Sequence, residues 1–391
     1  MIKISVIIAK RAMNASCVAL IIRDSASVHG LEPIINSRYS IAMQPHRVIV
    51  IVSLFAFFLF HQTLFATPHS YKQDSIPEEH RNVFPVSGFA AFSVNAMAAE
   101  SAEYVYQLGT VLSKLRWPLN PAVSYSVHAG LYFPKGIFFD GALSFVQPMR
   151  TGTMIDRDFE EATAVPPRPG VTKFSEHNCD IIDGIRGIAK LGLQLPMPRI
   201  AALRKNGISV LLGPMISFYY SSVSWHSYGG YLQYARIGKD GRYEQWSKHL
   251  PKIPVTGSAV SYRQQLLIPA IGIGVEASFP HQLQLFSDLH VSSDVMASGE
   301  DIHYARNIRF IDIMGGGFAL HGTTRLSWRC LPYFALFASV FYEYSVTTEG
   351  ISISYAGIKA SKPSRYSPPD AAGTSLGGCT FSLGFAFVLG R

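Results

Sequence analysis

Two short segments of the chain each carry a pair of titratable side chains that could act on a peptide or ester bond. TMIDRDFEE contains Asp156 and Asp158, and GEDIHYARN contains Asp301 and His303. Residues two apart on an extended strand project to the same side, so each pair would act as a unit. A carboxylate beside an imidazole fixes its tautomer and supports its charged form. Two close carboxylates tend to share one proton.

Together, these four groups could activate a water molecule. His303 and one aspartate would hold the water and remove its proton for attack on a carbonyl carbon, and the second aspartate would stabilise the oxyanion or supply a proton. Each pair alone is a weak signal, because acids and histidines in loops are usually solvated. The chemistry therefore depends on whether the fold brings the two pairs together.

The composition predicts that strands in a membrane position these pairs. Only 15% of the 391 residues are charged and 12% are aromatic, yet apart from one N-terminal run no stretch of about 20 apolar residues appears. Fragmented, alternating apolarity is typical of transmembrane strands. We expect an all-β fold, a ten-stranded antiparallel transmembrane β-barrel. The predicted runs are 86–106, 113–133, 137–158, 178–196, 207–228, 258–278, 282–298, 305–329, 334–349 and 376–389.

The connections between these runs predict where the two pairs lie. Short Pro-containing turns alternate with long polar loops at 159–177, 229–257 and 350–375, as in outer-membrane barrels. If alternation continues through the third run without a bulge, Asp156 and Asp158 face the interior near the long-loop end. The segment with Asp301 and His303 reaches the same end. Even-numbered charges of the fourth run, from Asp180 to Lys190, predict a lumen closed by salt bridges.

The N-terminal part of the chain predicts export. Residues 43–66 have the charge, apolar core and small residue before the cut that signal peptides share. For this apolar segment a membrane anchor is the competing interpretation, and residues 1–42 form an upstream extension. Residues 67–85 form a flexible lead-in, and 86–391 form the barrel.

Other features of the sequence exclude several partners. The formal charge of +8 is spread along the chain without a basic tract, so we expect no nucleic-acid partner. The four cysteines have no CxxC spacing, and we expect no metal site. Ser175 and His177 could form a serine nucleophile and its base, but two polar residues in a loop are more often ordinary surface groups.

Several motifs together resemble the omptins, ten-stranded outer-membrane endopeptidases of Gram-negative bacteria. The omptin motif Met-Val-Asp-Gln-Asp-Trp is similar to Met154–Phe159, and Asp-Glu-His-Tyr is similar to Asp301–Tyr304. Ser-Arg-His matches Ser175–His177, and Glu-Arg-Val-Tyr matches Glu103–Tyr106. Tyr-Lys-Gln-Arg-Phe-Lys-Met-Pro resembles Tyr262–Pro269. The resemblance covers about residues 86–391.

The resemblance implies catalytic roles. Asp156 and Asp158 would be the acid pair, Asp301 and His303 would be the dyad that activates water, and no cofactor would be needed. Ser175 and His177 would be candidates for a supporting role. The active site would face outward from the outer membrane.

The resemblance also implies a polypeptide substrate with Lys or Arg before the cut. Glu103 would bind that basic side chain. Where omptins have a second acid in this pocket, this chain has Gly299, so the adjacent Glu300 is the candidate substitute. Where omptins have an acid just before the Ser-x-His motif, this chain has Lys173. Omptins bind lipopolysaccharide on the outer wall, and here Arg263 is the candidate contact for this or another outer-membrane lipid.

Two other classes stay open at this point. A catalytically degenerate barrel could act as an adhesin or host-protein-binding surface, and the departures at Gly299 and Lys173 favour this alternative. A diffusion porin would need an open lumen, which the predicted interior charges argue against.

Overall fold

The computed structural model describes residues 86–159, 170–197, 206–239, 241, 243–347 and 349–389. The predicted upstream extension (1–42), signal peptide (43–66) and lead-in (67–85) lie outside these residues. Within the described part, no helix is long and apolar enough to cross a membrane. The only helical pieces there are two 3₁₀ turns, η3 (Pro134–Gly136) and η4 (Pro280–Gln282).

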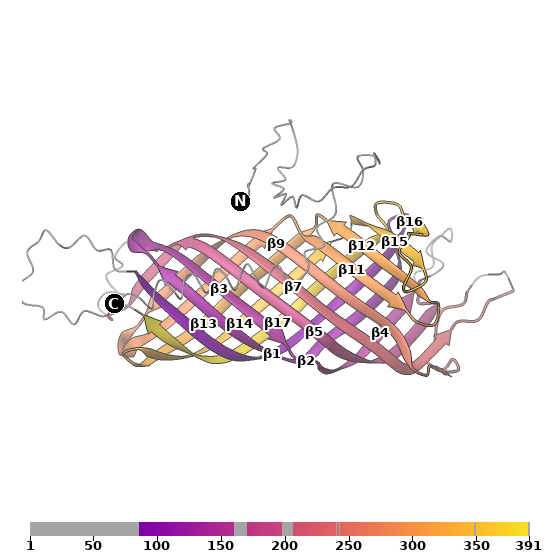
Figure 1. Cartoon of the computed structure of the whole chain (residues 1–391), viewed down its shortest axis with the longest axis horizontal. Coiled ribbons are helices and arrows are strands. Elements are labelled where there is room, and N and C mark those ends of the chain that lie inside the picture. Colours follow the sequence, from indigo (N-terminus) through magenta and orange to yellow (C-terminus); the bar gives the residue numbers. More distant parts are fainter. Residues whose placement is uncertain are drawn as a thin grey trace, which may run out of the picture. The chain divides into compact units, whose positions relative to one another are not determined.

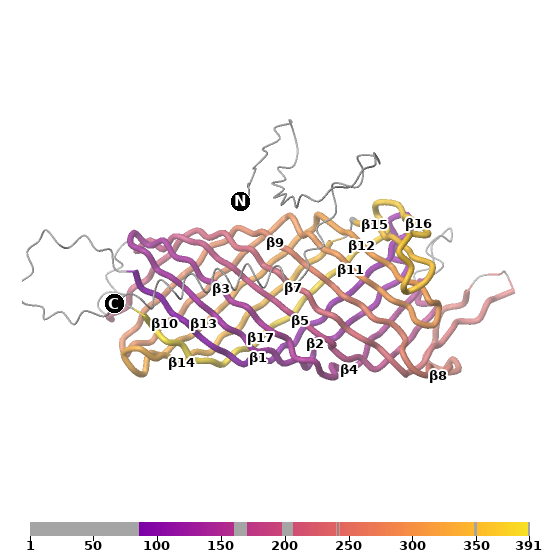
Figure 2. The backbone as a smooth tube through the Cα atoms, viewed as in Figure 1, coloured from indigo at the N-terminus to yellow at the C-terminus, as the bar shows by residue number. Residues whose placement is uncertain are grey.

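The described residues form 17 antiparallel strand segments that wrap into a barrel (Figures 1 and 2). They are β1 (Ser87–Gln107), β2 (Thr110–Tyr132), β3 (Ile137–Val146), β4 (Met149–Asp158), β5 (Lys173–Leu193), β6 (Leu195–Pro196), β7 (Ser209–Tyr234), β8 (Ile253–Pro254), β9 (Ser258–Ser278), β10 (Leu283–Ser292), β11 (Met296–His303), β12 (Ile308–Gly315), β13 (Phe318–Leu331), β14 (Phe334–Thr347), β15 (Glu349–Ala356), β16 (Arg365–Tyr366) and β17 (Ala372–Leu389).

The first and last strands pair with each other. β1 pairs with β2 along one edge and with β17 along the other, from Gly88↔Leu389 to Val105↔Ala372. Backbone groups on both edges of β1 are therefore satisfied within the protein, as a lipid environment requires. The all-β prediction is confirmed, although several predicted runs are divided. The run 137–158 is divided into β3 and β4, and the run 282–298 covers β10 and only the start of β11.

The interruption between β3 and β4 changes how Asp156 reaches the interior. The inward-facing residues are even-numbered up to Val146, odd-numbered at Thr151 and even-numbered again at Met154, and all three side chains are buried. The strand is interrupted at residues 147–148, and a register shift follows between Arg150 and Gly152. The expectation of unbroken alternation is wrong. Even parity is nevertheless restored before Asp156, because the two irregularities cancel.

A similar irregularity corrects the expectation for Asp180. A register shift between Ile181 and Asp183 reverses the alternation of β5. Cys179 and Ile181 are buried, whereas Asp180 is partly exposed and accepts a hydrogen bond from Tyr228, with 3.3 Å between Oδ1 and the hydroxyl oxygen. Asp180 therefore does not share the face of Arg186.

An apolar belt surrounds the half of the barrel that ends in the short turns. Its members are outward-facing and at least 36% exposed: Phe92, Val94, Tyr125, Val127, Phe145, Ile216, Phe218, Ile271, Ile273, Leu289, Val291, Leu326, Trp328, Leu336, Phe381, Leu383, Phe385 and Phe387. Beyond the belt, towards β11, β12, β15 and β16 on the right of Figure 1, the outer wall carries charged pairs such as Arg116–Glu100 and Arg309–Glu300. The belt therefore marks the part of the barrel that suits lipid.

Ion pairs cross the interior at the level of the belt. Arg186 of β5 pairs with Glu343 of β14, and Tyr219 donates a hydrogen bond to Glu343, with an O–O distance of 2.7 Å. Lys190 of β5 pairs with Asp288 of β10. These strands are not neighbours in the sheet, so the side chains span the lumen. The salt bridges support the expectation of a closed interior.

Candidate active site

Asp301 and His303 form a dyad near the end of β11, beyond the apolar belt. The distance between His303 Nε2 and Asp301 Oδ2 is 2.5 Å, and the side chains are 16% and 3% exposed. Arg306 approaches the other ring nitrogen, with 2.5 Å between its Nη2 and Nδ1. A guanidinium can only donate, so Nδ1 accepts and Nε2–H donates to Asp301. Phe310 of β12 packs its ring edge-to-face with the imidazole, with centroids 5.7 Å apart.

Asp156 faces this dyad from β4. Ser113 of β2 donates a hydrogen bond to Asp156 Oδ1, with an O–O distance of 3.2 Å. Burial, followed by the charges of Asp158 and Asp301, raises the pKa of Asp156 to about 8, while Ser113 and the charge of Arg306 oppose the rise. The charges of Asp301 and Arg306 both affect the pKa of Asp156, which indicates that Asp156 lies within electrostatic reach of the dyad.

Glu103 lies deeper in the opening at this end of the barrel, on β1. Its side chain is 2% exposed, and no hydrogen-bond partner contacts Oε2. Burial raises the pKa of Glu103 well above its ordinary value, and the charges of Asp301, Asp312 and Asp156 add to the effect. Four buried or half-buried carboxyl groups therefore share one low-dielectric space, where every added negative charge is costly.

An aromatic cluster closes the opening below these acids. Trp117 of β2 stacks on Tyr262 of β9 at 5.4 Å between ring centroids, and Trp225 of β7 stacks on Tyr262 at 6.0 Å. All three side chains are at most 1% exposed. Trp225 also donates a hydrogen bond to the carbonyl of Pro118, with 3.0 Å between Nε1 and the oxygen. The cluster separates the acids from the ion pairs at the level of the belt.

Glu300, the expected substitute for Gly299, points away from the opening. It lies between the inward-facing Gly299 and Asp301, and it pairs with Arg309 on the outer wall at 3.7 Å. The acid that faces the opening instead is Asp312 of β12, the register partner of Gly299. Asp312 was not among the residues expected from the sequence, although an acid flanked by apolar residues in RFIDIMG was a usable signal. Arg306 was not expected either.

Ser175 and His177 lie on β5, where a loop was expected. Ser175 is opposite Asp156 in the strand register and 4% exposed. His177 is 3% exposed and donates from Nδ1 to the carbonyl of Gly229, at 2.5 Å. Burial lowers the pKa of His177, and the bond to Gly229 opposes this. The imidazole is thus held by the backbone of β7 next to the acid pair.

Arg263 lies on the outer wall of β9. Its Nε donates to Ser224 at 3.0 Å, and its Nη2 is 3.9 Å from the Asp183 carboxylate. The Arg263 side chain is 44% exposed. The guanidinium therefore lies partly exposed on the outer surface.

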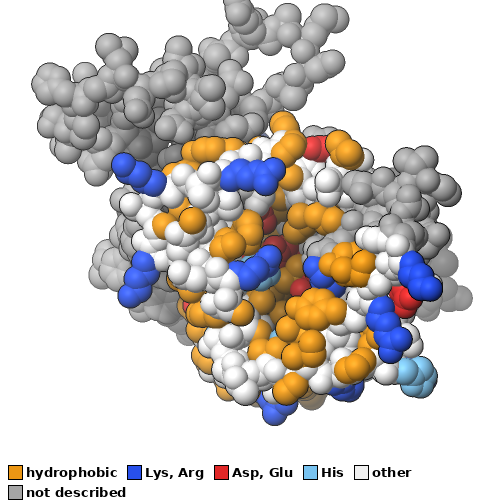
Figure 3. All heavy atoms as spheres, turned by 90° about the vertical axis from the view of Figure 1, so that its right-hand side faces the viewer, with side chains coloured by type: hydrophobic (Ala, Val, Ile, Leu, Met, Phe, Trp, Pro, Cys, Tyr) orange, Lys and Arg blue, Asp and Glu red, His pale blue; other side chains and the backbone are white. Residues whose placement is uncertain are grey.

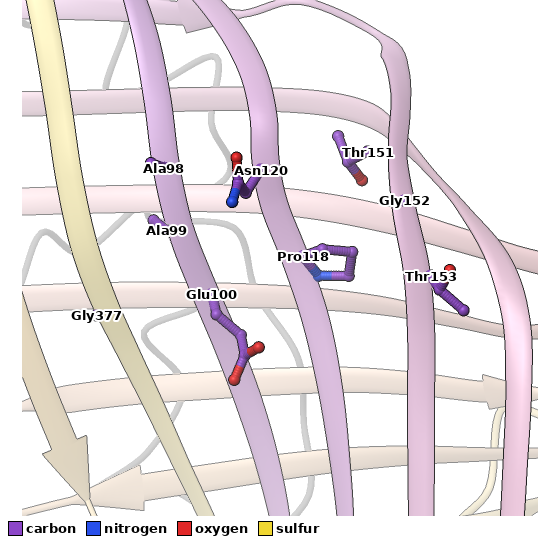
Figure 4. A pocket seen from close by; sticks show the side chains of 9 residues that line it. All are labelled: Ala98, Ala99, Glu100, Pro118, Asn120, Thr151, Gly152, Thr153 and Gly377. Carbon is purple, nitrogen blue, oxygen red and sulfur yellow. The ribbon is translucent and has the colours of Figure 1, made fainter.

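Two hollows in the barrel are distinct from the acidic opening. One of about 360 Å³ lies in the wall between β1, β2 and β4, lined by Glu100, Pro118, Asn120, Thr153 and small neighbours (Figure 4). The other, of about 500 Å³, lies at the short-turn end near Glu276 and Arg325. Among the described residues, no cluster of three or more His, Cys, Asp or Glu side chains could hold a metal ion.

The acidic opening is visible when the barrel is viewed from the end that carries β11, β12 and β15. Figure 3 shows acidic side chains at the bottom of a central hollow, surrounded by hydrophobic groups, with Lys and Arg side chains nearer the rim. A substrate entering here would meet hydrophobic and basic groups first and negative charge in the depth.

Comparisons with known proteins agree with this architecture. The profile of the Omptin family matches residues 88–389. The crystal structure of the outer membrane protease OmpT from Escherichia coli is similar at a TM-score of 0.64 and 16% identity, covering 81% of this chain and 100% of that one. The outer membrane protein OprG from Pseudomonas aeruginosa aligns at a TM-score of 0.31 and 8% identity, covering 78% and 95% of the two chains. No curated protein sequence matches the chain.

The fold is an all-β barrel similar to that of the outer membrane protease OmpT. The chain belongs to the Omptin family.

Proposed function

We propose that this protein is an endopeptidase in which the Asp301–His303 dyad activates water opposite the Asp156–Asp158 pair. The observation that carries the proposal is the short hydrogen bond of the dyad together with the electrostatic effect of Asp301 on Asp156. The hydrogen bond and the electrostatic effect together support a reaction space shared by β11 and β4.

The proposed reaction begins when Arg306 leaves Nδ1 of His303, which frees the basic nitrogen. Nδ1 takes a proton from a water molecule, and the resulting hydroxide attacks the peptide carbonyl carbon. Asp301 stabilises the imidazolium. Asp156 holds a proton at neutral pH because its pKa is raised, and it donates that proton towards the carbonyl oxygen. The C–N bond then breaks as the amine takes the proton from His303, and Asp156 takes back its proton from the hydroxyl group as the C=O bond of the carboxyl product reforms.

We also propose that the substrate carries Lys or Arg before the cut, bound by Glu103. A buried carboxylate without a partner on Oε2 supports this preference, because a cation would satisfy it.

The strand pairings support a barrel of ten long strands, some of which are divided into two segments. β3 with β4, β10 with β11, β12 with β13, and β14 with β15 would each form one long strand, with β1, β2, β5, β7, β9 and β17 as the others. The predicted signal peptide (43–66) and the apolar belt favour export to the outer membrane, with the acidic opening outside. Arg263 beyond the belt is the proposed contact for lipopolysaccharide or another outer-membrane lipid.

A cleavage assay tests the mechanism. The full chain, purified in detergent with lipopolysaccharide, is incubated with quenched fluorogenic peptides that contain Arg or Lys. Asp156→Ala and His303→Ala should each lower kcat about 10²- to 10⁴-fold, the usual contribution of acid–base catalysis. His249→Ala, on an exposed loop, is the matched control. Full activity of either site variant would refute the mechanism.

The same assay decides between the protease and the degenerate barrel. If the wild-type protein cleaves no peptide of a mixed library but still binds host proteins, the adhesin alternative is correct.

A further inference from the structure

Two buried acids in the depth of the opening each have one oxygen without a hydrogen-bond partner. Asp312 is 4% exposed and its Oδ1 has no hydrogen-bond partner, and the same holds for Oε2 of Glu103 at 2% exposure. Glu103 is opposite Thr374 in the strand register, and Thr374 Oγ1 lies 3.3 Å from the hydroxyl of Tyr262. Tyr262 and Asp312 both lie beside Gly299, so the same ring links the two acids in space. Leaving such buried acids unpaired is unfavourable, and a bound cation would relieve them.

A glycine shapes the wall beside Asp312. Gly299 is opposite Asp312 in the register of β11 and β12. A Cβ added at Gly299 would lie 3.2 Å from the ring of Tyr262, which is tighter than ordinary contact, and 3.5 Å from Cβ of Asp312, so the glycine lets the Tyr262 ring approach Asp312 closely. Asp312 is therefore the acid that this part of the chain presents to the opening, in place of a side chain at 299.

The aromatic rings favour a cation in this space. Tyr262 lies against Gly299, and Trp117 stacks on Tyr262. The charges of Glu103 and Asp312 both act on the hydroxyl of Tyr262. A Lys ammonium or an Arg guanidinium between acids and aromatic faces gains both ion pairing and cation–π attraction.

The distance along the strand from the dyad to Asp312 suits a long basic side chain. Asp301 is opposite Phe310, and Gly299 is opposite Asp312, so Asp312 lies one alternation deeper. At roughly 3.3 Å per residue this is about 7 Å along the strand. A long basic side chain could thus reach Asp312 while its own carbonyl group stays beside His303.

We propose that Asp312 is a specificity-determining residue, which together with Glu103 binds the Lys or Arg side chain that precedes the scissile bond. This inference rests on the proposed function. It assigns the second acid of the pocket to β12, and it excludes Glu300, which is paired on the outer wall.

Two peptides that differ only in Arg or citrulline before the cut test this role, because citrulline keeps the shape and lacks the charge. Asp312→Asn should lower kcat/KM for the Arg peptide about 10- to 100-fold, mainly through KM, and change the citrulline peptide less than about threefold. Glu300→Gln should leave the ratio of the two peptides unchanged. An unaltered Arg-to-citrulline ratio in Asp312→Asn, or a loss of the ratio in Glu300→Gln, would overturn the assignment.

A binding measurement separates this inference from the peptidase proposal. Agmatine carries a guanidinium on a short chain and has no bond to cleave. Calorimetry of the detergent-solubilised full chain should give at least about tenfold weaker agmatine binding for Asp312→Asn than for the wild type. If the wild type binds agmatine in an Asp312-dependent way but cleaves no peptide, the binding role of Asp312 is supported and the peptidase proposal is refuted. If the wild type cleaves Arg peptides and Asp312→Asn binds agmatine normally, the pocket fails alone.

Discussion

Replacing Asp301 by asparagine removes one charge from the dyad while keeping its shape. The amide oxygen of the introduced side chain can still accept the hydrogen bond from Nε2–H of His303, so the ring orientation should persist. The change therefore isolates how much the carboxylate stabilises the imidazolium that forms when His303 takes a proton from water. A large rate loss without a loss of folding is the expected outcome.

The size of the effect follows from the distance and the burial. The two contacting atoms are 2.5 Å apart and the side chains are 16% and 3% exposed, so the pair is mostly shielded from solvent. For charge centres about 4 Å apart, an effective dielectric constant of about 20 gives about 4 kcal/mol. That corresponds to about a 10³-fold loss in kcat. With a water-like dielectric constant of about 80, the loss would be only about fivefold.

Steady-state hydrolysis of the Arg peptide provides the measurement. Glu100→Gln is the matched control, because this carboxylate pairs with Arg116 on the outer wall and its loss should change kcat less than about twofold. Tryptophan emission from the buried Trp117 and Trp225 verifies that each variant is folded. A loss below about tenfold in folded Asp301→Asn would show that the dyad does not work through its charge.

Three further outcomes are expected. Arg306→Ala frees Nδ1 of His303 from an exposed donor worth at most about 1 kcal/mol, so kcat/KM should rise about two- to fivefold, and an unchanged or lower value would contradict the proposed obstruction. Because its raised pKa keeps Asp156 protonated below about pH 8, kcat should fall as the pH rises through that value, and a flat profile to about pH 10 would exclude Asp156 as the proton donor. Glu343→Gln leaves Arg186 without its ion-pair partner in the interior and should lower the free energy of unfolding in urea by about 3–5 kcal/mol. The double variant Arg186→Met with Glu343→Leu should recover most of that free energy. Equal losses in the single and the double variant would argue against the ion pair as the cause.

Much of the barrel was predictable because a strand in a membrane leaves a strong pattern in its own sequence. Alternation from Phe381 to Leu389 follows from one lipid-facing side, and β17 spans these residues. The pairs Asp156–Asp158 and Asp301–His303 were recognisable because their spacing of two matches the period of a strand. Irregular positions were not predictable. The shift between Arg150 and Gly152 depends on how β4 pairs with β5, which neighbouring residues alone do not encode.

The sequence by itself determined the all-β class, the family and the two pairs of residues that could do chemistry, since these depend on local periodicity and short motifs. Only the tertiary structure decided which acids share a space. Glu300 was the nearest acid to Gly299 along the chain, yet pleating turns it to the outer wall, where Arg309 neutralises it. Asp312 lies thirteen positions from Gly299 in the chain but directly opposite it across the strand pair. Contacts across strands arise from register, and register is a property of the whole barrel.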